Sequence, residues 1–109
     1  MSDDVLQRLA AVIHSRRAEN AAKSYTRELL DAGPERCARK LGEEATETII
    51  AALGTDTIAL TREAADLVYH MLVLLESRQV AWSDVAGELE RRMGTSGLEE
   101  KAARKSSPP

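Results

Sequence analysis

The segment from Ile58 to Leu75 is apolar on nearly every side when it is drawn as a helix, and this pattern strongly restricts the fold. Such a helix is stable only when other elements surround it, so it belongs at the centre of a bundle. Glu63 and Asp66 nevertheless lie inside it, three residues apart. An ionised carboxylate in a low-dielectric interior is costly unless it is paired or binds a metal. The segment therefore predicts a central helix with two acids placed where water is scarce, and a cation beside them.

The rest of the chain also has helical patterns, because apolar residues recur every three to four positions between capping residues. The expected helices are bounded by caps, a proline or glycines: Asp3 or Asp4 to about Arg16, Tyr25 to Asp31, Pro34 to Leu53, about Thr57 to Arg78, and Ser83 to Gly94. Ser96 and Glu99 form a capping box for a last turn or two, and residues 105–109 are expected to be a frayed tail. No segment alternates as a strand does. We therefore predict an all-α fold, a bundle of about five helices in one domain over residues 1–104.

Two further stripes of apolar residues are expected to face the core. The stripe on the third helix comprises Cys37, Leu41, Ala45, Ile49 and Ala52. The stripe on the fifth helix comprises Val85, Ala86, Leu89 and Met93. Both stripes are typical of helices that pack on one side only.

Composition excludes several classes of function. The net charge of -3 argues against a nucleic-acid coat or a polybasic membrane anchor, since both need a surplus of Lys and Arg. Cys37 is the only cysteine, so an intrachain disulfide and a thiolate zinc site are excluded, and we expect a small core residue in a reducing cytoplasm. The start of the chain lacks the features of a secretory signal, and the run from Leu67 to Leu75 is about half the length that crosses a bilayer. A soluble cytoplasmic protein is expected.

A second acidic pair repeats the spacing of the first. Glu44 and Glu47 fall on one stripe of the third helix, beside its apolar stripe, so antiparallel packing against the central helix would bring four carboxylates together. Four negative charges repel strongly unless cations neutralise them. Oxygen ligands select hard divalent ions, of which Mg²⁺ is the usual choice beside phosphate and Mn²⁺ a substitute. Hydrolysis of a phosphoanhydride needs what such ions provide, because they orient a water and neutralise charge on the departing pyrophosphate.

Each of these residues also has a plainer interpretation. Two glutamates three residues apart on a helix are a common solvated pattern. His70 could be a hydrogen-bonded core residue, a metal ligand, or a group that holds a metal-binding carboxylate in place. Lys40 could be a surface neighbour of Glu44 or a phosphate contact.

Several motifs resemble the phosphoribosyl-ATP pyrophosphatase family of histidine biosynthesis. The acidic motifs are Lys40-Leu41-Gly42-Glu43-Glu44-Ala45-Thr46-Glu47 and Glu63-Ala64-Ala65-Asp66-Leu67-Val68-Tyr69-His70. These motifs are shared with the wider all-α nucleoside triphosphate pyrophosphohydrolases, the MazG-like and dimeric dUTPase relatives. Ser24-Tyr25-Thr26 and the segment from Arg92 through Ser96-Gly97-Leu98-Glu99-Glu100-Lys101-Ala102 to Arg104 are the specific part. The resemblance covers about residues 5 to 105.

The resemblance implies Mg²⁺-dependent hydrolysis of phosphoribosyl-ATP to phosphoribosyl-AMP and pyrophosphate, the second step of the pathway. Carried over by position, the metal ligands are Glu44, Glu47, Glu63 and Asp66. The catalytic set is Glu43, Glu44 and Glu47, with Glu43 as an extra ligand or the base for water. The substrate contacts are Ser24, Tyr25, Lys40, Arg92, Lys101 and Arg104. The resemblance also implies a homodimer.

Two other functions fit parts of the pattern. A housekeeping MazG-like pyrophosphohydrolase of noncanonical nucleoside triphosphates would need the same four acids and the same metal. A helical interaction module without catalysis would carry the acidic stripes only as solvated faces. The number of metal ions and the acid that activates water stay open at this stage.

Overall fold

Every regular element in the described part of the chain is a helix, as the sequence predicts. The structure is a computed structural model, and it describes residues 4–93 and 97–106. The α-helices are α1 (Val5–Ser15), α2 (Tyr25–Ala32), α3 (Pro34–Ala52), α4 (Thr57–Ser77), α5 (Trp82–Met93) and α6 (Gly97–Ser106). Two short 3-10 turns, Arg16–Ala18 and Ala21–Lys23, connect α1 to α2. The all-α fold class is therefore confirmed.

The helices begin at the expected caps. The side chains of Asp4, Ser24 and Asp56 accept hydrogen bonds from backbone N–H groups of α1, α2 and α4. α5 begins at Trp82, slightly earlier than expected, and α6 continues to Ser106, into the segment expected to be a tail. The alternative cap Asp3, the stop at Gly94 and the capping residue Ser96 lie outside the described residues.

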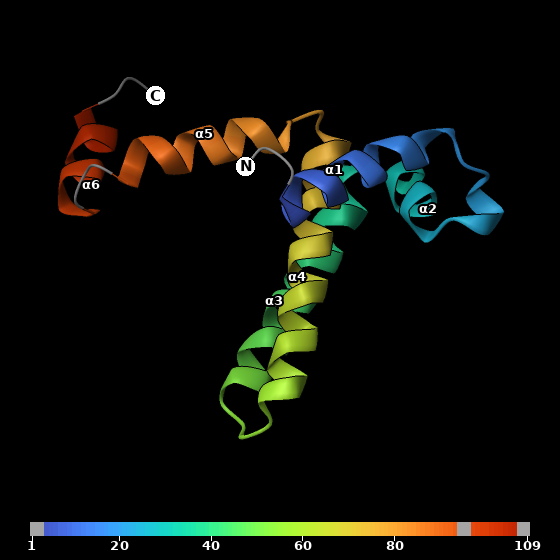
Figure 1. Cartoon of the computed structure of the whole chain (residues 1–109), viewed down its shortest axis with the longest axis horizontal. Helices are drawn as coiled ribbons and strands as arrows, with labels where there is room; N and C mark the ends of the chain where they lie inside the picture. The colour runs from blue at the N-terminus through green and yellow to red at the C-terminus, as the bar shows by residue number, and fades with distance from the viewer. Residues whose placement is uncertain (1–3, 94–96, 107–109) are drawn as a thin grey trace.

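α3 and α4 form a long antiparallel hairpin, which extends away from the other helices (Figure 1). Thr48 of α3 ties the two helices together, because its hydroxyl donates to the carbonyl oxygen of Glu63 at 3.1 Å. The core lies at the open end of the hairpin, where α1 and α2 also pack. Its buried residues are Ile13, Leu29, Cys37, Leu72 and Val73. α4 is thus the central helix at this end only, and Cys37 is the core residue that the sequence predicts.

Much apolar surface is left uncovered in a single chain. Ile49 is 61% exposed, Leu89 47% and Met93 81%, so the prediction that these three face the core is wrong for the single chain. Figure 1 shows α5 and α6 leading away from the α3–α4 hairpin, which agrees with this exposure. The radius of gyration of 16.2 Å also exceeds the roughly 13 Å of a compact domain of this length.

None of the helices in residues 4–93 and 97–106 is both long enough and apolar enough to cross a membrane.

Candidate functional site

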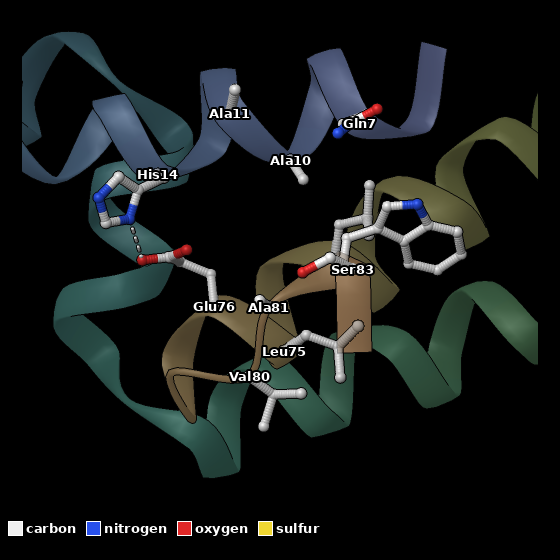
Figure 2. A pocket seen from close by; sticks show the side chains of 11 residues that line it. Gln7, Ala10, Ala11, His14, Leu75, Glu76, Val80, Ala81 and Ser83 are labelled. Carbon is white, nitrogen blue, oxygen red and sulfur yellow. Dashed lines mark hydrogen bonds and ion pairs between the residues drawn. The ribbon is translucent and has the colours of Figure 1, made fainter. Parts of the chain in front are cut away.

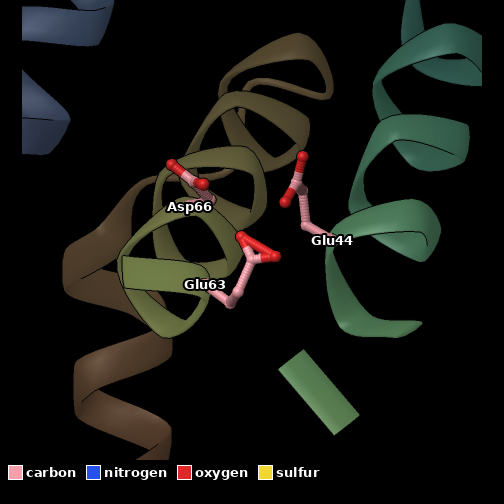
Figure 3. A group of neighbouring side chains, drawn as sticks. All are labelled: Glu44, Glu63 and Asp66. Atoms are coloured by element: carbon pink, nitrogen blue, oxygen red, sulfur yellow. The ribbon is translucent and has the colours of Figure 1, made fainter. Parts of the chain in front are cut away.

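The hairpin brings together three of the four acids that the sequence selects as metal ligands. Glu44 comes from α3, and Glu63 and Asp66 come from successive turns of α4 (Figure 3). One carboxylate oxygen from each lies within 4.8 Å of the others. The geometry follows from the sequence, because a spacing of three residues places both α4 acids on the face that looks towards α3. An oxygen-only group of this kind suits a hard divalent cation.

Glu44 is the most buried acid of this group. Its side chain is only 13% exposed, and its Oε2 atom is buried without a hydrogen-bond partner. Burial, followed by the neighbouring carboxylates of Glu47, Asp66 and Glu63, raises the pKa of Glu44 to about 7. Burial and the charges of Glu47 and Asp66 raise the pKa of Glu63 as well. A buried oxygen without a partner and a cluster that resists ionisation both fit a site that is completed by a cation.

Asp66 does not lie where the sequence places it. We expected both acids of α4 in an apolar interior, but Asp66 is exposed and Glu63 is only half-buried, so the expectation is wrong for Asp66. α3 packs against α4 along the hairpin, and among the described residues this packing leaves the side chain of Asp66 exposed. The apolar residues around the acids therefore do not enclose them.

Glu47 lies one turn beyond Glu44 and outside the group of three. Its side chain is still close enough to raise the pKa values of both Glu44 and Glu63. It also lines a hollow of about 330 Å³ that opens beside the cluster. The lining residues of this hollow, called the hairpin hollow below, are Glu47, Ile50, Ala51, Ala59, Arg62 and Glu63. Glu47 thus links the carboxylates to an open space with an apolar floor.

Arg62 is a lining residue that the sequence analysis did not select. It directly precedes Glu63 and lines the hairpin hollow together with Glu47 and Glu63. The signal that could have found it is a cation adjacent to a predicted metal ligand on the same helix. Arginine is well suited to bind phosphate, because its planar fork donates two parallel hydrogen bonds.

Lys40 and Glu43 pair with each other on α3. The Lys40 Nζ atom lies 3.1 Å from Glu43 Oε1, and the Glu43 side chain is half exposed. This hydrogen bond to Glu43 is the main cause that raises the pKa of Lys40. Lys40 therefore pairs with Glu43 rather than with Glu44, and Glu43 is turned towards a cation instead of towards the cluster.

The N-terminal motif lies at the start of α2. Ser24 caps the helix by accepting a hydrogen bond from the backbone N–H of Arg27 at 3.1 Å. Tyr25 is 47% exposed, and the edge of its ring meets His70. Thr26 is buried and hydrogen-bonded to the hydroxyl of Tyr69. Tyr25 is thus the member of the motif that is both exposed and close to the acidic helices.

His70 is a buried residue of α4 next to the cluster. It is 5% exposed, and its Nε2 atom lies 4.0 Å from Glu44 Oε1. Its Nδ1 atom is buried without a hydrogen-bond partner. His70 is therefore neither a member of the ligand group nor a hydrogen-bonded core histidine.

The C-terminal candidates are not brought to the cluster within one chain. Arg92 of α5 pairs with Glu88 at 2.9 Å, and Lys101 and Arg104 are exposed on α6. Figure 1 shows α5 and α6 leading away from the α3–α4 hairpin. As substrate contacts, these three residues stay predictions.

A second hollow of about 390 Å³ lies where α1 meets the turn between α4 and α5 (Figure 2). Its lining is mainly apolar and includes Leu75, Val80 and Trp82. His14 and Glu76 meet at one end, with 3.0 Å between Nδ1 and Oε2. None of the residues that the sequence selects lines this hollow.

The helical fold and the carboxylates gathered between α3 and α4 define the class of all-α pyrophosphohydrolases. Residues 6–93 match the family model of phosphoribosyl-ATP pyrophosphohydrolase. The chain belongs to this family.

Relatives that carry the name phosphoribosyl-ATP pyrophosphatase match nearly the whole chain. The protein of Jannaschia sp. (strain CCS1) is 56% identical over 99 residues, which cover 91% of this chain and 97% of the relative. The protein of Nitrobacter winogradskyi is 57% identical over 96 residues, which cover 88% of this chain and 83% of the relative. The protein of Cereibacter sphaeroides (strain ATCC 17025 / ATH 2.4.3) is 52% identical over 100 residues, with 92% and 97% covered.

Proposed function

We propose that this chain hydrolyses phosphoribosyl-ATP to phosphoribosyl-AMP and pyrophosphate, the second step of histidine biosynthesis, with water activated by Mg²⁺. The metal ion is supported by one observation: oxygen atoms of three carboxylates lie within 4.8 Å of one another, and one of these carboxylates has a buried oxygen without a hydrogen-bond partner. The substrate is supported by membership in the family and by relatives of that name that are more than half identical.

The acids divide the work by position. Glu44, Glu63 and Asp66 would hold the ion, since their oxygens converge. A bound Mg²⁺ would supply positive charge that neutralises the phosphate groups and would lower the pKa of a water, which makes that water a better nucleophile. Glu47, at the rim of the hairpin hollow, is better placed than Glu43 to orient that water, because Glu43 is paired with Lys40.

The hairpin hollow would receive part of the substrate. Its apolar floor, Ile50 with Ala51 and Ala59, suits a sugar or base, and Arg62 would bind a phosphate group. This position lets the substrate approach the cluster from the side of Glu47 and Glu63.

Substrate competition tests the proposal. Purified protein with Mg²⁺ should release pyrophosphate from phosphoribosyl-ATP far faster than from ATP or dUTP. Equal rates on ordinary triphosphates would instead indicate a housekeeping MazG-like enzyme, and no release from any of them, together with no stabilisation by Mg²⁺ or Mn²⁺, would indicate a helical interaction module. The chain should also restore growth to a histidine auxotroph that lacks this step, while a matched Asp66→Asn variant should not.

We also propose that the active form is a homodimer and that a second copy completes the site. Two features support this. The single chain leaves Ile49, Leu89 and Met93 exposed, and α6 lies away from the carboxylates of its own chain. A twofold partner would cover apolar faces and could bring Lys101 and Arg104 of one subunit to the acids of the other.

A further inference from the structure

His70 is a buried histidine with one ring nitrogen that has no hydrogen-bond partner. Its side chain is 7% exposed, its Nδ1 atom has no hydrogen-bond partner, and its Nε2 atom lies 4.0 Å from Glu44 Oε1. Buried polar groups are normally hydrogen-bonded, because leaving one unpaired costs stability. An apolar side chain of similar size would pack equally well at this position. We therefore expect the ring nitrogens of His70 to have a function.

The ring of His70 is held between two tyrosines. Its centroid lies 5.0 Å from that of Tyr69 and 6.1 Å from that of Tyr25, and both pairs meet edge to face at 78° and 87°. The Tyr69 hydroxyl is itself hydrogen-bonded to Thr26. Two of the three residues of the motif at the start of α2 therefore fix the histidine, one directly and one through Tyr69.

We propose that His70 is a positioning residue that orients the Glu44 carboxylate for the metal ion, and that Tyr25 supports the site by holding the His70 ring. The inference rests on the proposed function, because it assigns a task at the same metal site. It gives the N-terminal motif a second role beside any contact with substrate.

The chemistry of the pair agrees with this role. Burial, followed by the charge of Lys40, lowers the pKa of His70. A neutral ring has one N–H donor, and the Glu44 carboxylate in front of Nε2 is an acceptor. The gap of 4.0 Å exceeds a hydrogen bond by about 1 Å, a distance that a small turn of the Glu44 side chain would close. Groups that hydrogen-bond to a metal ligand typically change metal affinity about 10- to 100-fold when they are removed.

The affinity for Mn²⁺ in the absence of substrate tests the proposal by calorimetry. His70→Leu should weaken Mn²⁺ binding about 10-fold or more. His70→Gln should recover most of it, because its amide donor lies where Nε2 was, whereas His70→Asn has its amide nearer to Nδ1 and should not. Tyr25→Leu should also weaken Mn²⁺ binding, which a contact with substrate alone would not do. His14→Gln changes an exposed histidine of α1 and is the matched control with unchanged affinity.

Several outcomes would overturn the inference. Mn²⁺ affinities of His70→Leu and His70→Gln within twofold of the unaltered chain would show that the histidine does not orient a ligand. If His70→Leu fails to fold, equal Mn²⁺ affinities of His70→Gln and His70→Asn would likewise show that the histidine does not orient a ligand. Failure of the unaltered chain to bind Mn²⁺ at all would count against the metal site itself, and so against the proposed function.

Discussion

At the residue scale, the acidic cluster opposes folding of the metal-free chain, and the proposed function uses the same charges to hold a metal ion. Glu44 is mostly buried among like charges. Burial and the neighbouring carboxylates disfavour its ionised form and raise its pKa to about 7 when no cation is bound. A bound divalent ion reverses this preference, because an opposite charge a few ångströms away stabilises the ionised form. Under the proposed function, the free energy lost to repulsion in the metal-free chain would be regained when the ion binds.

Neutralising one acid should separate these two effects. We expect Asp66→Asn and Glu47→Gln each to lower turnover of phosphoribosyl-ATP by about 100-fold or more. Each change keeps the shape of the side chain but removes a charge, at the proposed ion site for Asp66 and beside the attacking water for Glu47. In EDTA, the same variants should be as stable as the unaltered chain or up to about 1 kcal/mol more stable, because repulsion is relieved. Steady-state kinetics and urea melts measure the two quantities.

Glu90→Gln is a suitable control, because Glu90 is an exposed glutamate of α5. It should change neither turnover nor stability in EDTA by a measurable amount. Retention of most of the activity in both acid variants would refute the metal site, and a clear loss of stability in EDTA would refute the account of repulsion.

The sequence predicts which acids meet but not how they are covered. The spacings within α3 and α4 fix the faces on which Glu44, Glu63 and Asp66 lie, and a hairpin then makes them converge. The exposure of an acid depends on which elements pack beside the hairpin, and local sequence patterns do not specify this packing. The sequence therefore predicts burial for Asp66, whose side chain is exposed. The contact between Tyr25 and His70 joins segments that are far apart in the chain, and helical periodicity cannot predict it.

At the element scale, the turn between α4 and α5 carries a local strain. Gln79 has φ of 59°, and its N–H and that of Val80 donate to the carbonyl oxygens of Glu76 and Leu75 at 3.0 and 2.9 Å. This is the Schellman arrangement that ends many helices, with glutamine where glycine is usual. The hydrogen bonds of the turn satisfy the last carbonyls of α4 and fix where α5 begins.

Gln79→Gly should stabilise the fold by about 0.5–1 kcal/mol. Glycine adopts positive φ without the steric cost that other residues meet. The free energy gained by removing this cost exceeds the free energy lost because glycine has more conformational entropy in the unfolded chain. Gln79→Ala keeps that cost and should leave stability nearly unchanged, so it is the matched control. The midpoints of urea melts at fixed metal concentration compare them, and a glycine variant that is less stable than the alanine variant would contradict the argument.

Acid should loosen the attachment of α1 to α4. Burial alone would raise the pKa of Glu76, but hydrogen bonds from Arg17 and His14 more than offset it, so the pKa lies below its ordinary value. A lowered pKa in the folded state gives stability that is present above the unfolded value of about 4.3 and is lost as the pH falls through the folded value. Glu76→Gln should therefore cost about 1–2 kcal/mol at pH 7 and progressively less below pH 4.

Urea melts of the two chains between pH 7 and pH 3 measure that difference. Glu88→Gln is a useful comparison. Hydrogen bonds from Arg91 and Arg92 lower the pKa of Glu88 to about 2, but the group is exposed on α5, where solvent screens such pairs. Glu88→Gln should therefore lower the stability at pH 7 by less than Glu76→Gln does. A Glu76→Gln penalty that is constant across this pH range would contradict the assigned cause.

At the scale of the whole molecule, the single chain is extended and leaves large apolar side chains exposed. The sequence predicts its helices well because caps and periodicity are local signals. The sequence does not tell whether an apolar stripe, such as the one through Leu89 and Met93, packs on its own chain or on a second chain. Either kind of packing would bury the same surface. The helices expected to close a five-helix bundle instead leave the acidic hairpin uncovered on one side. The second copy proposed above would cover this side.

Mixing of two inactive variants should show whether a partner also completes the site. Asp66→Asn damages the hairpin, and a Lys101→Ala/Arg104→Ala double variant damages α6. If α6 of one subunit serves the acids of the other, each variant alone should be nearly inactive. A dimer formed from one chain of each kind, however, contains one intact site. Equal mixing after unfolding and refolding gives half mixed dimers, so we expect about a quarter of full activity.

The matched control mixes Asp66→Asn with Glu47→Gln. Both changes lie in the hairpin, so every site of a mixed dimer keeps one defect and no activity should return. If the α6 variant is nearly inactive alone but its mixture with Asp66→Asn also recovers nothing, each chain uses its own α6, and α5 and α6 must then move to reach the hairpin. If the α6 variant is fully active alone, Lys101 and Arg104 do not contact the substrate, and the resemblance in the C-terminal segment does not extend to its role.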